Sequence, residues 1–377
     1  MTQSRLSPIR RHDGVFGAAG FDLVSKRHSN ISTRAPIEAA DNLTAVQYSL
    51  FRGDALDAYE SWAPPACIIA DGPYGLAKFP GEPSSPDRLS EWYAPHAAAW
   101  ARHAQPSTTL WFWNSEIGWA KAHPALEAHG WQYEETVVWN KGIAHVAGNC
   151  NSKTIRGMPV VTELAVRYTR KVSLPSVGGR LLPIKEWLRN EWLRSGRPMY
   201  ESNRACGVVN AATRKYLTQC HMWYFPPGEA LVAMAKWCTK HGAKTDRPYF
   251  SIDGKGEPTV EEWDRMRAKW THTHGLTNVW QEPPVHNGER VRVAGSSSRY
   301  LHANQKPLAL MERQINASTS ANDVVWEPFG GLCSATVAAV RLGRTAYAAE
   351  INENFYAAAL LRINTEIGSR NSAAKED

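Results

Sequence analysis

The residues best suited to chemistry lie in the stretch 323–356, DVVWEPFGGLCSATVAAVRLGRTAYAAEINENFY. An apolar strand there runs into Glu327-Pro328-Phe329-Gly330-Gly331, and a second strand ends at Glu350. Because glycine has no Cβ, this turn can approach a ligand closely, and the helix after it presents its N-terminal amides. Glu350 follows Glu327 by 23 residues, near the roughly 20-residue spacing at which an acidic side chain binds ribose hydroxyls in nucleotide-binding βαβ units.

The carboxylate of Glu327 narrows the class of ligand. It would repel a pyrophosphate but could hold an ammonium group, and the chain has no G-x-x-x-x-G-K-[ST] motif for a nucleoside triphosphate. The pattern therefore indicates a ligand that carries both an adenosine and an amino acid. An ordinary βα turn, with glycines that serve packing alone, is the structural alternative.

A second turn, Ala70-Asp71-Gly72-Pro73-Tyr74-Gly75, follows the short apolar strand 66–70. It brings a carboxylate, a backbone carbonyl and an aromatic ring together. Such a set suits chemistry on a planar amine, because the two oxygens can accept the two amine hydrogens while the ring stacks on the base. Taken alone, the string is also compatible with a plain turn.

In this order, the two turns resemble those of the amino-group DNA methyltransferases, which use S-adenosylmethionine to methylate N6 of adenine or N4 of cytosine. The arrangement is similar to the permuted β group, in which the catalytic half precedes the cofactor half. Asp71-Gly72-Pro73-Tyr74 resembles the D/S-P-P-Y motif and Glu327-Pro328-Phe329-Gly330-Gly331 resembles D-P-F-x-G. His302-Ala303-Asn304-Gln305-Lys306-Pro307-Leu308 is similar to H-x-x-Q-K-P-L, and Val138-Trp139-Asn140-Lys141 matches the W-x-K strand. The resemblance covers about residues 46–171 and 300–367.

The resemblance implies the roles of the site residues. The catalytic residues would be Asp71, Gly72, Pro73 and Tyr74. S-adenosylmethionine, the implied cofactor, would be bound by Asp54, Gln305, Lys306, Glu327, Phe329, Gly330, Gly331 and Glu350. Transfer would be direct, without a covalent intermediate, on a base that has left the duplex. Asp54 has an equally weighted alternative role as a strand-end cap.

Two positions depart from the family motifs. Gly72 replaces the first proline, which keeps the main-chain carbonyl but loses the φ restriction of the ring. Glu327 replaces an aspartate, which keeps the charge and lengthens the side chain. We expect activity to survive both changes.

Strands alternate with helices on both sides of the middle of the chain, which favours βα units and a mostly parallel sheet. Strands are expected at 46–54, 66–71, 109–113, 133–139, 323–327 and 345–350, with an edge strand at 163–171; helices are expected at 89–104, 116–129, 184–194, 306–316, 333–342 and 354–367. With the resemblance, the fold class is α/β, a Rossmann-like methyltransferase fold with a mixed, mostly parallel seven-stranded sheet. The expected organisation is a basic polar arm (1–45), a catalytic half (46–171), an inserted target-recognition region (172–300), a cofactor half (301–368) and a tail (369–377).

The inserted region contains a basic stretch between residues 180 and 215. We expect it to bind DNA phosphates through Arg180, Lys185, Arg189, Arg194, Arg197, Arg204, Arg214 and Lys215. A solvated charged face is the alternative interpretation.

Composition sets outer limits on the class of protein. The 377 residues carry a net charge of +7 and are 43% hydrophobic, which excludes global disorder and favours polyanionic partners. No apolar run reaches the roughly 20 residues of a membrane span, and no N-terminal apolar segment indicates secretion. The six cysteines are scattered, so no metal site is expected. We expect a cytoplasmic, DNA-associated protein whose partner is double-stranded DNA. The sequence is compatible with the presence or absence of a cognate restriction endonuclease, and with a monomer or a homodimer.

Adenine N6 is the first expected target, because position 71 holds aspartate rather than serine. Cytosine N4 is the alternative within the class. An RNA methyltransferase and a non-catalytic DNA-binding relative are the further alternatives.

Overall fold

The computed structural model describes residues 48–79, 81–146, 156–218, 221–296 and 298–373. The predicted N-terminal arm (1–45) and the last four residues lie outside this part of the chain. Within the described residues, no helix is both long and apolar enough to cross a membrane.

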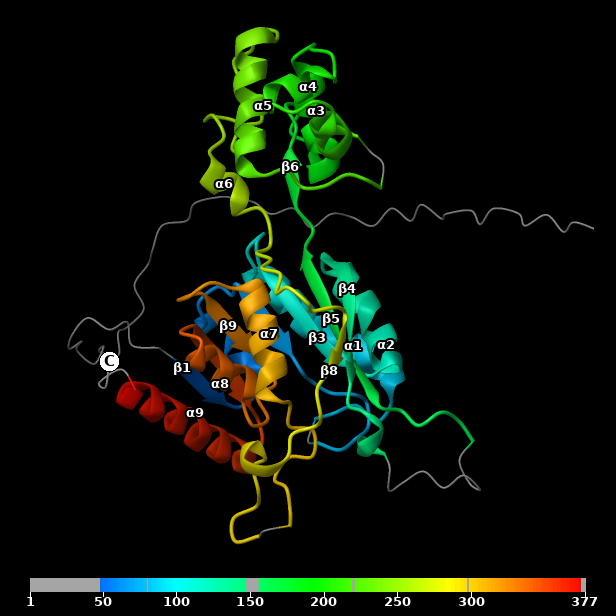
Figure 1. Ribbon diagram of the computed structural model, residues 1–377, viewed down its shortest axis with the longest axis vertical. Helices are drawn as coiled ribbons and strands as arrows, with labels where there is room; N and C mark the ends of the chain where they lie inside the picture. The colour runs from blue at the N-terminus through cyan, green and yellow to red at the C-terminus, as the bar shows by residue number, and fades with distance from the viewer. Residues whose placement is uncertain (1–47, 80, 147–155, 219–220, 297, 374–377) are drawn as a thin grey trace, which may run out of the picture. The chain divides into compact units, whose positions relative to one another are not determined.

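An eight-stranded sheet forms the centre of the fold (Figure 1). Its order is β1-β10-β9-β2-β3-β5-β4-β8. The strands are β1 (Tyr48–Arg52), β2 (Cys67–Ala70), β3 (Thr109–Asn114), β4 (Trp131–Asn140), β5 (Thr162–Arg170), β8 (Val279–Gln281), β9 (Val324–Glu327) and β10 (Thr345–Glu350). Only β5 pairs antiparallel with its neighbours among these strands. The mixed, mostly parallel α/β class is confirmed.

Two details of the predicted sheet are wrong. The sheet has eight strands rather than seven, because three residues within the predicted inserted region (172–300) form β8, which pairs with the outer side of β4. The strand at 163–171 is not an edge strand, since β5 lies between β3 and β4. It pairs with β3 on one side and with β4 on the other, and β8 covers the outer side of β4.

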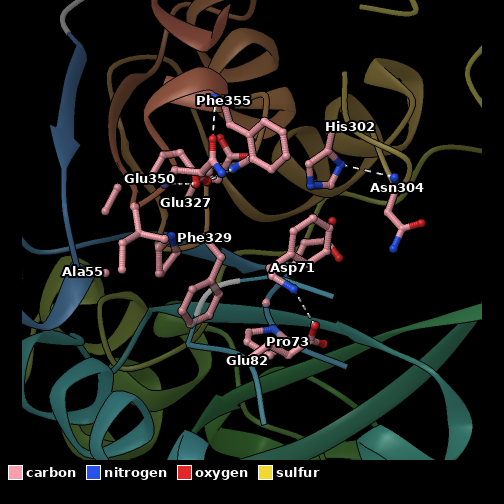
Figure 2. Close-up of a pocket in the computed structure, with 18 of the residues that line it drawn as sticks. Ala55, Asp71, Pro73, Glu82, His302, Asn304, Glu327, Phe329, Glu350 and Phe355 are labelled. Carbon is pink, nitrogen blue, oxygen red and sulfur yellow. Dashed lines mark hydrogen bonds between the residues drawn. The ribbon is translucent and has the colours of Figure 1, made fainter. Parts of the chain in front are cut away.

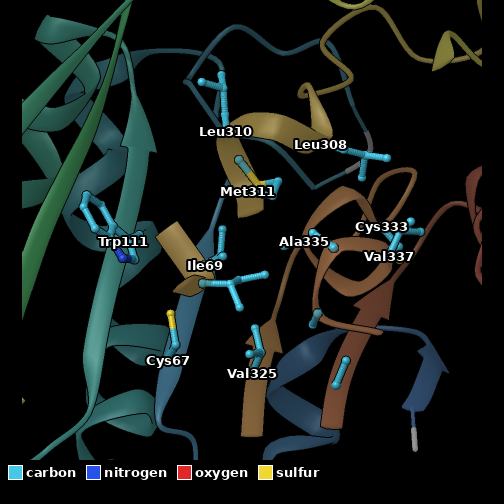
Figure 3. Close-up of a cluster of buried hydrophobic side chains, with 14 of the residues drawn as sticks. Cys67, Ile69, Trp111, Leu308, Leu310, Met311, Val325, Cys333, Ala335 and Val337 are labelled. Atoms are coloured by element: carbon cyan, nitrogen blue, oxygen red, sulfur yellow. The ribbon is translucent and has the colours of Figure 1, made fainter. Parts of the chain in front are cut away.

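Side-chain alternation along the strands divides the core into two layers. In β2, Cys67 and Ile69 point to one layer and Ile68 and Ala70 to the other. The first layer is covered by α7 (Leu308–Ser318), α8 (Ser334–Arg341) and α9 (Glu353–Ala373), as Figure 3 shows for α7 and α8. The second is covered by α1 (Leu89–His103) and α2 (Glu116–Ala128). The helix α9 extends beyond its predicted end at 367.

The inserted region forms its own small core. It contains β6 (Ser173–Pro175), β7 (Leu181–Pro183), α3 (Ile184–Arg194), α4 (Glu201–Ala205), a π-helical turn at Thr213–Leu217, α5 (Gly228–His241) and α6 (Val260–Asp264). The helix predicted at 184–194 is confirmed, and it buries Trp187, Leu188 and Trp192 in that core.

The parallel strands place chemically useful residues at one edge of the sheet. Asp71 directly follows β2, Asn114 ends β3, Glu327 ends β9 and Glu350 ends β10. Because carboxyl ends of parallel strands meet at the same edge, these four side chains are brought together although they are far apart in the sequence. The candidate site lies at this carboxyl edge.

Candidate active site

One pocket at the carboxyl edge is lined by both turns singled out in the sequence. It has a volume of about 210 Å³. All the predicted catalytic and cofactor residues line it, namely Asp54, Asp71, Gly72, Pro73, Tyr74, Gln305, Lys306, Glu327, Phe329, Gly330, Gly331 and Glu350. None of the eight predicted DNA-binding residues does. Figure 2 shows Asp71, Glu327, Phe329 and Glu350 around this pocket.

Lys306, which was predicted on the cofactor side, is bonded to the Asp71 carboxylate. Its Nζ lies 2.7 Å from Oδ1 and 2.8 Å from Oδ2 of Asp71, 3.2 Å from the Tyr74 hydroxyl and 3.2 Å from Glu163 Oε2. The lysine side chain is only 3% exposed. A buried ammonium is costly unless it is paired, so this contact fixes Asp71 and Lys306 to each other.

Glu163 and Lys141 extend this contact into a chain of alternating charges. Lys141 Nζ donates to Glu163 Oε1, and both side chains are nearly buried. Burial raises the pKa of the Glu163 carboxyl, but Lys306 and Lys141 outweigh it and the net shift is downward. Burial lowers the pKa of Lys306, and Asp71 with Glu163 outweighs that effect and raises it. Lys306 is therefore held as a cation.

Asp71 is itself subject to opposing effects. Burial raises the pKa of its carboxyl, and Lys306 partly offsets this rise. The Tyr74 hydroxyl donates to Asp71 Oδ1 at 3.0 Å. Asp71 Oδ1 accepts hydrogen bonds from both the Tyr74 hydroxyl and Lys306 Nζ, whereas Oδ2 accepts one, from Lys306 Nζ.

The turn after Asp71 is held by hydrogen bonds and by packing. The Pro73 carbonyl accepts from the Tyr93 hydroxyl at 3.0 Å and from Asn114 Nδ2 at 3.0 Å. A Cβ on Gly72 would lie 2.5 Å from Phe329 Cδ2 and 2.6 Å from the Tyr93 hydroxyl. A side chain therefore does not fit at position 72. Within the described residues, the Gly72 carbonyl has no hydrogen-bond partner.

Glu82 holds the loop that follows this turn. Its carboxylate accepts from the backbone amides of Tyr74 at 2.8 Å and Lys78 at 2.7 Å, and more weakly from Leu76 and Phe79. One side chain thus satisfies four amides of a segment that has no regular secondary structure. Glu82 also lines the pocket.

Glu327 is used to cap α8. The residue before the helix, Cys333, has a left-handed backbone (φ 53°) and makes no side-chain cap. The Glu327 carboxylate instead accepts from the Ala335 amide at 3.0 Å and from the amide and hydroxyl of Thr336 at 2.7 and 2.6 Å. Burial raises the pKa of Glu327 to about 7, and these hydrogen bonds offset only part of the rise. Its predicted role toward an ammonium group thus gains a competing one, the positioning of α8.

Glu350 closes the glycine turn from the neighbouring strand. Its Oε2 accepts from the Gly331 amide at 2.6 Å and its Oε1 from the Asn352 amide at 2.6 Å. Gly331 has a φ of +52°, a conformation that disfavours side chains. The exposed Ile351 and the ring of Phe355 stand beside this carboxylate on the pocket wall.

Asp54 and Gln305 also have contacts within the chain. Asp54 Oδ1 accepts from the Leu56 amide at 2.9 Å, as a strand-end cap would. The side-chain amide of Gln305 accepts from the Val291 amide at 3.0 Å and donates to the Glu289 carbonyl at 2.8 Å. Gln305 therefore anchors the 289–291 segment to the pocket wall.

Several of the predicted DNA-binding residues are tied to the inserted region itself. Arg194 is bonded to Glu191 and to the carbonyls of Arg247 and Pro248. Arg197 pairs with Glu201, Arg180 with Glu186, and Arg189 donates to the Leu217 carbonyl. Lys185 lies 6.0 Å from the Trp223 ring. Arg204, Arg214 and Lys215 are exposed and pair with no carboxylate among the described residues.

Sequence reasoning missed Glu82, Tyr93, Asn114 and Glu163. Asn114 and Glu163 had a usable signal, because each is a polar residue at the end of a strand that meets the carboxyl edge. Tyr93 and Glu82 had none, since their contacts depend on how α1 and the preceding loop fold over the turn.

Part of the chain matches the model of a known protein family. Residues 207–361 match the N6/N4 family model described as DNA methylase. This match includes the glycine turn and Glu350, and the Asp71 turn lies outside it.

Two curated relatives match over shorter stretches. The type II methyltransferase M.ScaI of Streptomyces caespitosus is 30% identical over 125 residues, which are 32% of this chain and 40% of that protein. The type II methyltransferase M.HpaI of Haemophilus parainfluenzae is 31% identical over 96 residues, 26% of this chain and 28% of that one. The chain thus matches less than half the length of either relative.

Similar solved structures cover more of the chain at low identity. The PvuII DNA methyltransferase, described as cytosine-N4-specific, has a TM-score of 0.47 and 13% identity over 86% of this chain and 93% of that one. The M1.HpyAVI complex with SAM has a TM-score of 0.41 and 15% identity over 84% and 100%.

Replacing Gly72 by alanine should overpack the turn. The added methyl group would overlap the Phe329 ring and the Tyr93 hydroxyl, and overpacking typically costs about 1–3 kcal/mol. We expect urea denaturation to show a loss of that size for G72A. Gly178→Ala is the matched control, because its added Cβ meets nothing within 4 Å. Equal stability of the two variants would contradict the tight packing at position 72.

Glu327 should make the stability of the protein fall as the pH rises toward 7. Its folded pKa of about 7 exceeds the ordinary value of 4.5, so in that window the folded chain keeps a proton that the unfolded chain has lost. The unfolding free energy of the wild type minus that of E327Q should decrease from pH 5 to pH 7 and level off above it. Glu229→Gln, at an exposed position, is the control. A difference that stays flat with pH would refute the raised pKa.

Proposed function

We propose that this chain, whose residues 207–361 match the N6/N4 DNA methylase family model, transfers a methyl group from S-adenosylmethionine to the exocyclic N6 amine of adenine in DNA. One observation carries the proposal. The Asp71 turn and the Gly330–Gly331 turn line the same pocket, so an amine held at the first lies within reach of a cofactor held at the second.

The pocket wall around the glycine turn fits the cofactor. Glu350 uses one lone pair of each oxygen on backbone amides, and a carboxylate has about four lone-pair sites. Its remaining lone pairs can accept from ribose hydroxyls. Beside it, the exposed side chain of Ile351 offers an apolar surface to a purine ring. Gly330 and Gly331 let the backbone approach the amino-acid end, with Phe329 and Asp54 beside it.

The Asp71 turn fits a planar amine. Lys306 and Tyr74 occupy three of the roughly four lone-pair sites of the Asp71 carboxylate. The open site is on Oδ2, which can accept one amine hydrogen. The Gly72 carbonyl, which has no partner in the described chain, can accept the other. The Pro73 carbonyl cannot serve as easily, because Tyr93 and Asn114 already bind it.

These two acceptors would activate the amine. Its lone pair is delocalised into the ring, and hydrogen bonds to both hydrogens favour a tetrahedral nitrogen whose lone pair points out of the ring plane. When bound, S-adenosylmethionine supplies an electrophilic methyl group on its sulfonium. Asp71 Oδ2 can then take the proton that the nitrogen loses, and burial of the carboxyl favours that state by raising its pKa. Positioning and electrostatics supply the rate enhancement.

The charge chain behind Asp71 keeps the acceptor oriented. Lys306 bonds both Asp71 oxygens, and Glu163 with Lys141 holds Lys306 from behind. Tyr74, bonded to Asp71 through its hydroxyl, is placed to stack on the extruded base. The proposed partner is double-stranded DNA, and the proposed location is the cytoplasm. The proposal holds with or without a cognate restriction endonuclease.

Changing Asp71 to Ala or Asn should abolish methyl transfer and leave cofactor binding nearly intact. The reason is that Asp71 holds the amine, whereas Glu350 and the glycine turn hold the cofactor. The test measures tritium transfer from labelled S-adenosylmethionine to DNA, with calorimetric cofactor binding in parallel. Asp57→Asn, at an exposed position outside the pocket, should retain wild-type transfer. Turnover retained by the Asp71 variants would refute the role.

Analysis of the labelled nucleosides separates the other candidates. N6-methyl-2′-deoxyadenosine from the DNA supports the proposal, and N4-methyl-2′-deoxycytidine moves the target to cytosine. Transfer to RNA alone identifies an RNA methyltransferase. Binding of DNA without any transfer identifies a non-catalytic relative.

Removing the charge of Lys306 should lower kcat by about 100-fold, the order seen when a preorganised electrostatic group is lost. In K306M, Asp71 loses the cation that opposes its raised pKa. The acid limb of the kcat profile should therefore move to higher pH, with activity partly recovered as the pH rises. K306R should retain most of the activity.

The control for Lys306 is Lys121→Met, a surface lysine paired with Asp87. A K306M profile that is merely scaled down, with its acid limb unmoved, would contradict the electrostatic role and leave a packing role.

A further inference from the structure

The predicted DNA-binding stretch 180–215 belongs to a block that joins the sheet at its amino edge, opposite the pocket. The chain leaves the end of β5, where the Lys171 amide donates to the Gly130 carbonyl just before β4 begins. It returns through Lys269, which pairs with Asp323 just before β9, and through Thr271, whose amide bonds to the Ala317 carbonyl near the end of α7. Both connections therefore lie at the edge from which the parallel strands start.

The strand β8 then carries the chain along the sheet to the pocket edge. It runs parallel to β4, with Val138 opposite Val279 and Asn140 opposite Gln281. At its end, Trp139 Nε1 donates to the Glu282 carbonyl at 2.7 Å. The segment from Glu282 to Lys306 thus lies at the carboxyl edge, and the path can be followed in yellow in Figure 1.

This segment contains a hairpin whose described residues are 289–296 and 298–301, here called the basic hairpin. The Leu301 amide donates to the Val291 carbonyl at 3.1 Å and the Val293 amide to the Arg299 carbonyl at 2.9 Å. The base of the hairpin is fixed to the pocket wall, because Gln305 bonds the backbone of Glu289 and Val291.

Positive charge dominates the outer surface of the basic hairpin. It carries Arg290, Arg292 and Arg299, of which the last two are exposed. The guanidiniums of Arg290 and Arg292 lie 4.5 and 5.3 Å from the ring centroid of Tyr300, so the ring holds two cations in place. The hairpin's one acid, Glu289, is turned inward and accepts from the Leu308 amide at 2.8 Å.

We propose that the basic hairpin is the phosphate-binding element that holds the DNA strand beside the extruded base. This inference rests on the proposed function and names the DNA contact of that site. Guanidiniums bind phosphate oxygens with paired hydrogen bonds, and such contacts set the position of a protein on DNA. Gln305, which anchors this cation cluster, directly precedes Lys306, the partner of Asp71. The cluster therefore positions the strand where the base must enter.

The test compares three charge-neutralised forms of the full chain, each lacking three cations. They are R290Q/R292Q/R299Q in the hairpin, R204Q/R214Q/K215Q in the inserted block and, as the matched control, R88Q/R102Q/K121Q, which lie just before α1, in α1 and in α2. Binding to a labelled random-sequence duplex is measured by fluorescence anisotropy over a range of salt concentrations, with cofactor affinity and unfolding midpoint alongside.

We expect the hairpin variant to bind DNA at least tenfold more weakly than the wild type. The slope of log affinity against log salt concentration should become shallower by about 0.9 for each phosphate contact removed. Its cofactor affinity should stay at the wild-type value. If the hairpin variant unfolds, R292Q/R299Q, which spares the partly buried Arg290, should still lose about 1.8 in slope, the sum for two contacts. The α1 and α2 variant should bind as the wild type does.

An unchanged salt slope in the hairpin variants, or a loss confined to the inserted-block variant, overturns the inference and assigns DNA binding to the stretch 180–215. Methyl transfer by the wild type is measured in the same samples. If the wild type methylates DNA but the hairpin variants keep the wild-type salt slope, the proposed function stands and only the role of the basic hairpin is refuted. A wild type that neither binds nor methylates DNA refutes both the proposed function and the role of the hairpin.

Discussion

The pocket depends on one buried ion pair, between Lys306 and Asp71. The two residues are 235 positions apart in the sequence, yet Nζ bonds both carboxylate oxygens. A lysine that is 3% exposed is strongly destabilising without its partners, so the half of the fold that carries Asp71 and the half that carries Lys306 stabilise each other at this point. The same contact orients the carboxylate that we propose as the acceptor for the amine, so the folding of the domain and its proposed chemistry depend on one ion pair.

Carboxylates hold the turns around the pocket in place of regular secondary structure. Glu82 binds four loop amides, Glu327 caps α8 and Glu350 binds the amides of Gly331 and Asn352. Loops at the end of a sheet leave amides without partners, and each of these side chains satisfies several of them. The loops can therefore keep a fixed shape before any ligand is present, as preorganised catalysis requires.

The sequence predicted the elements and the residues of the pocket better than their contacts. Alternating strands and helices, the two turns and the glycines follow from local patterns, and their meeting at one edge follows from parallel strands. The contact of Lys306 with Asp71 could not be predicted, because a motif gives spacing along the chain and not which lysine crosses to which turn. The eighth strand and the interior position of β5 were missed for the same reason, since three residues of β8 form a strand only through pairing with β4. The position of the helices α3 to α6 relative to the sheet follows only from the contacts of Lys171 and Thr271, where this block joins the sheet, and neither residue lies in a distinctive sequence.

Gly72 illustrates how a departure from a motif can be offset by packing. A proline at this position would restrict φ through its ring, and glycine gives up that restriction. In this chain the neighbouring Pro73 carbonyl is bound twice, by Tyr93 and Asn114, and the Phe329 ring occupies the space that a side chain at position 72 would need. The turn is thus constrained from outside by groups on α1, β3 and the glycine turn rather than from within by a ring. Because Phe329 belongs to the Glu327–Gly331 turn, the shape of the Asp71 turn, the proposed amine site, depends directly on the turn proposed to bind the cofactor.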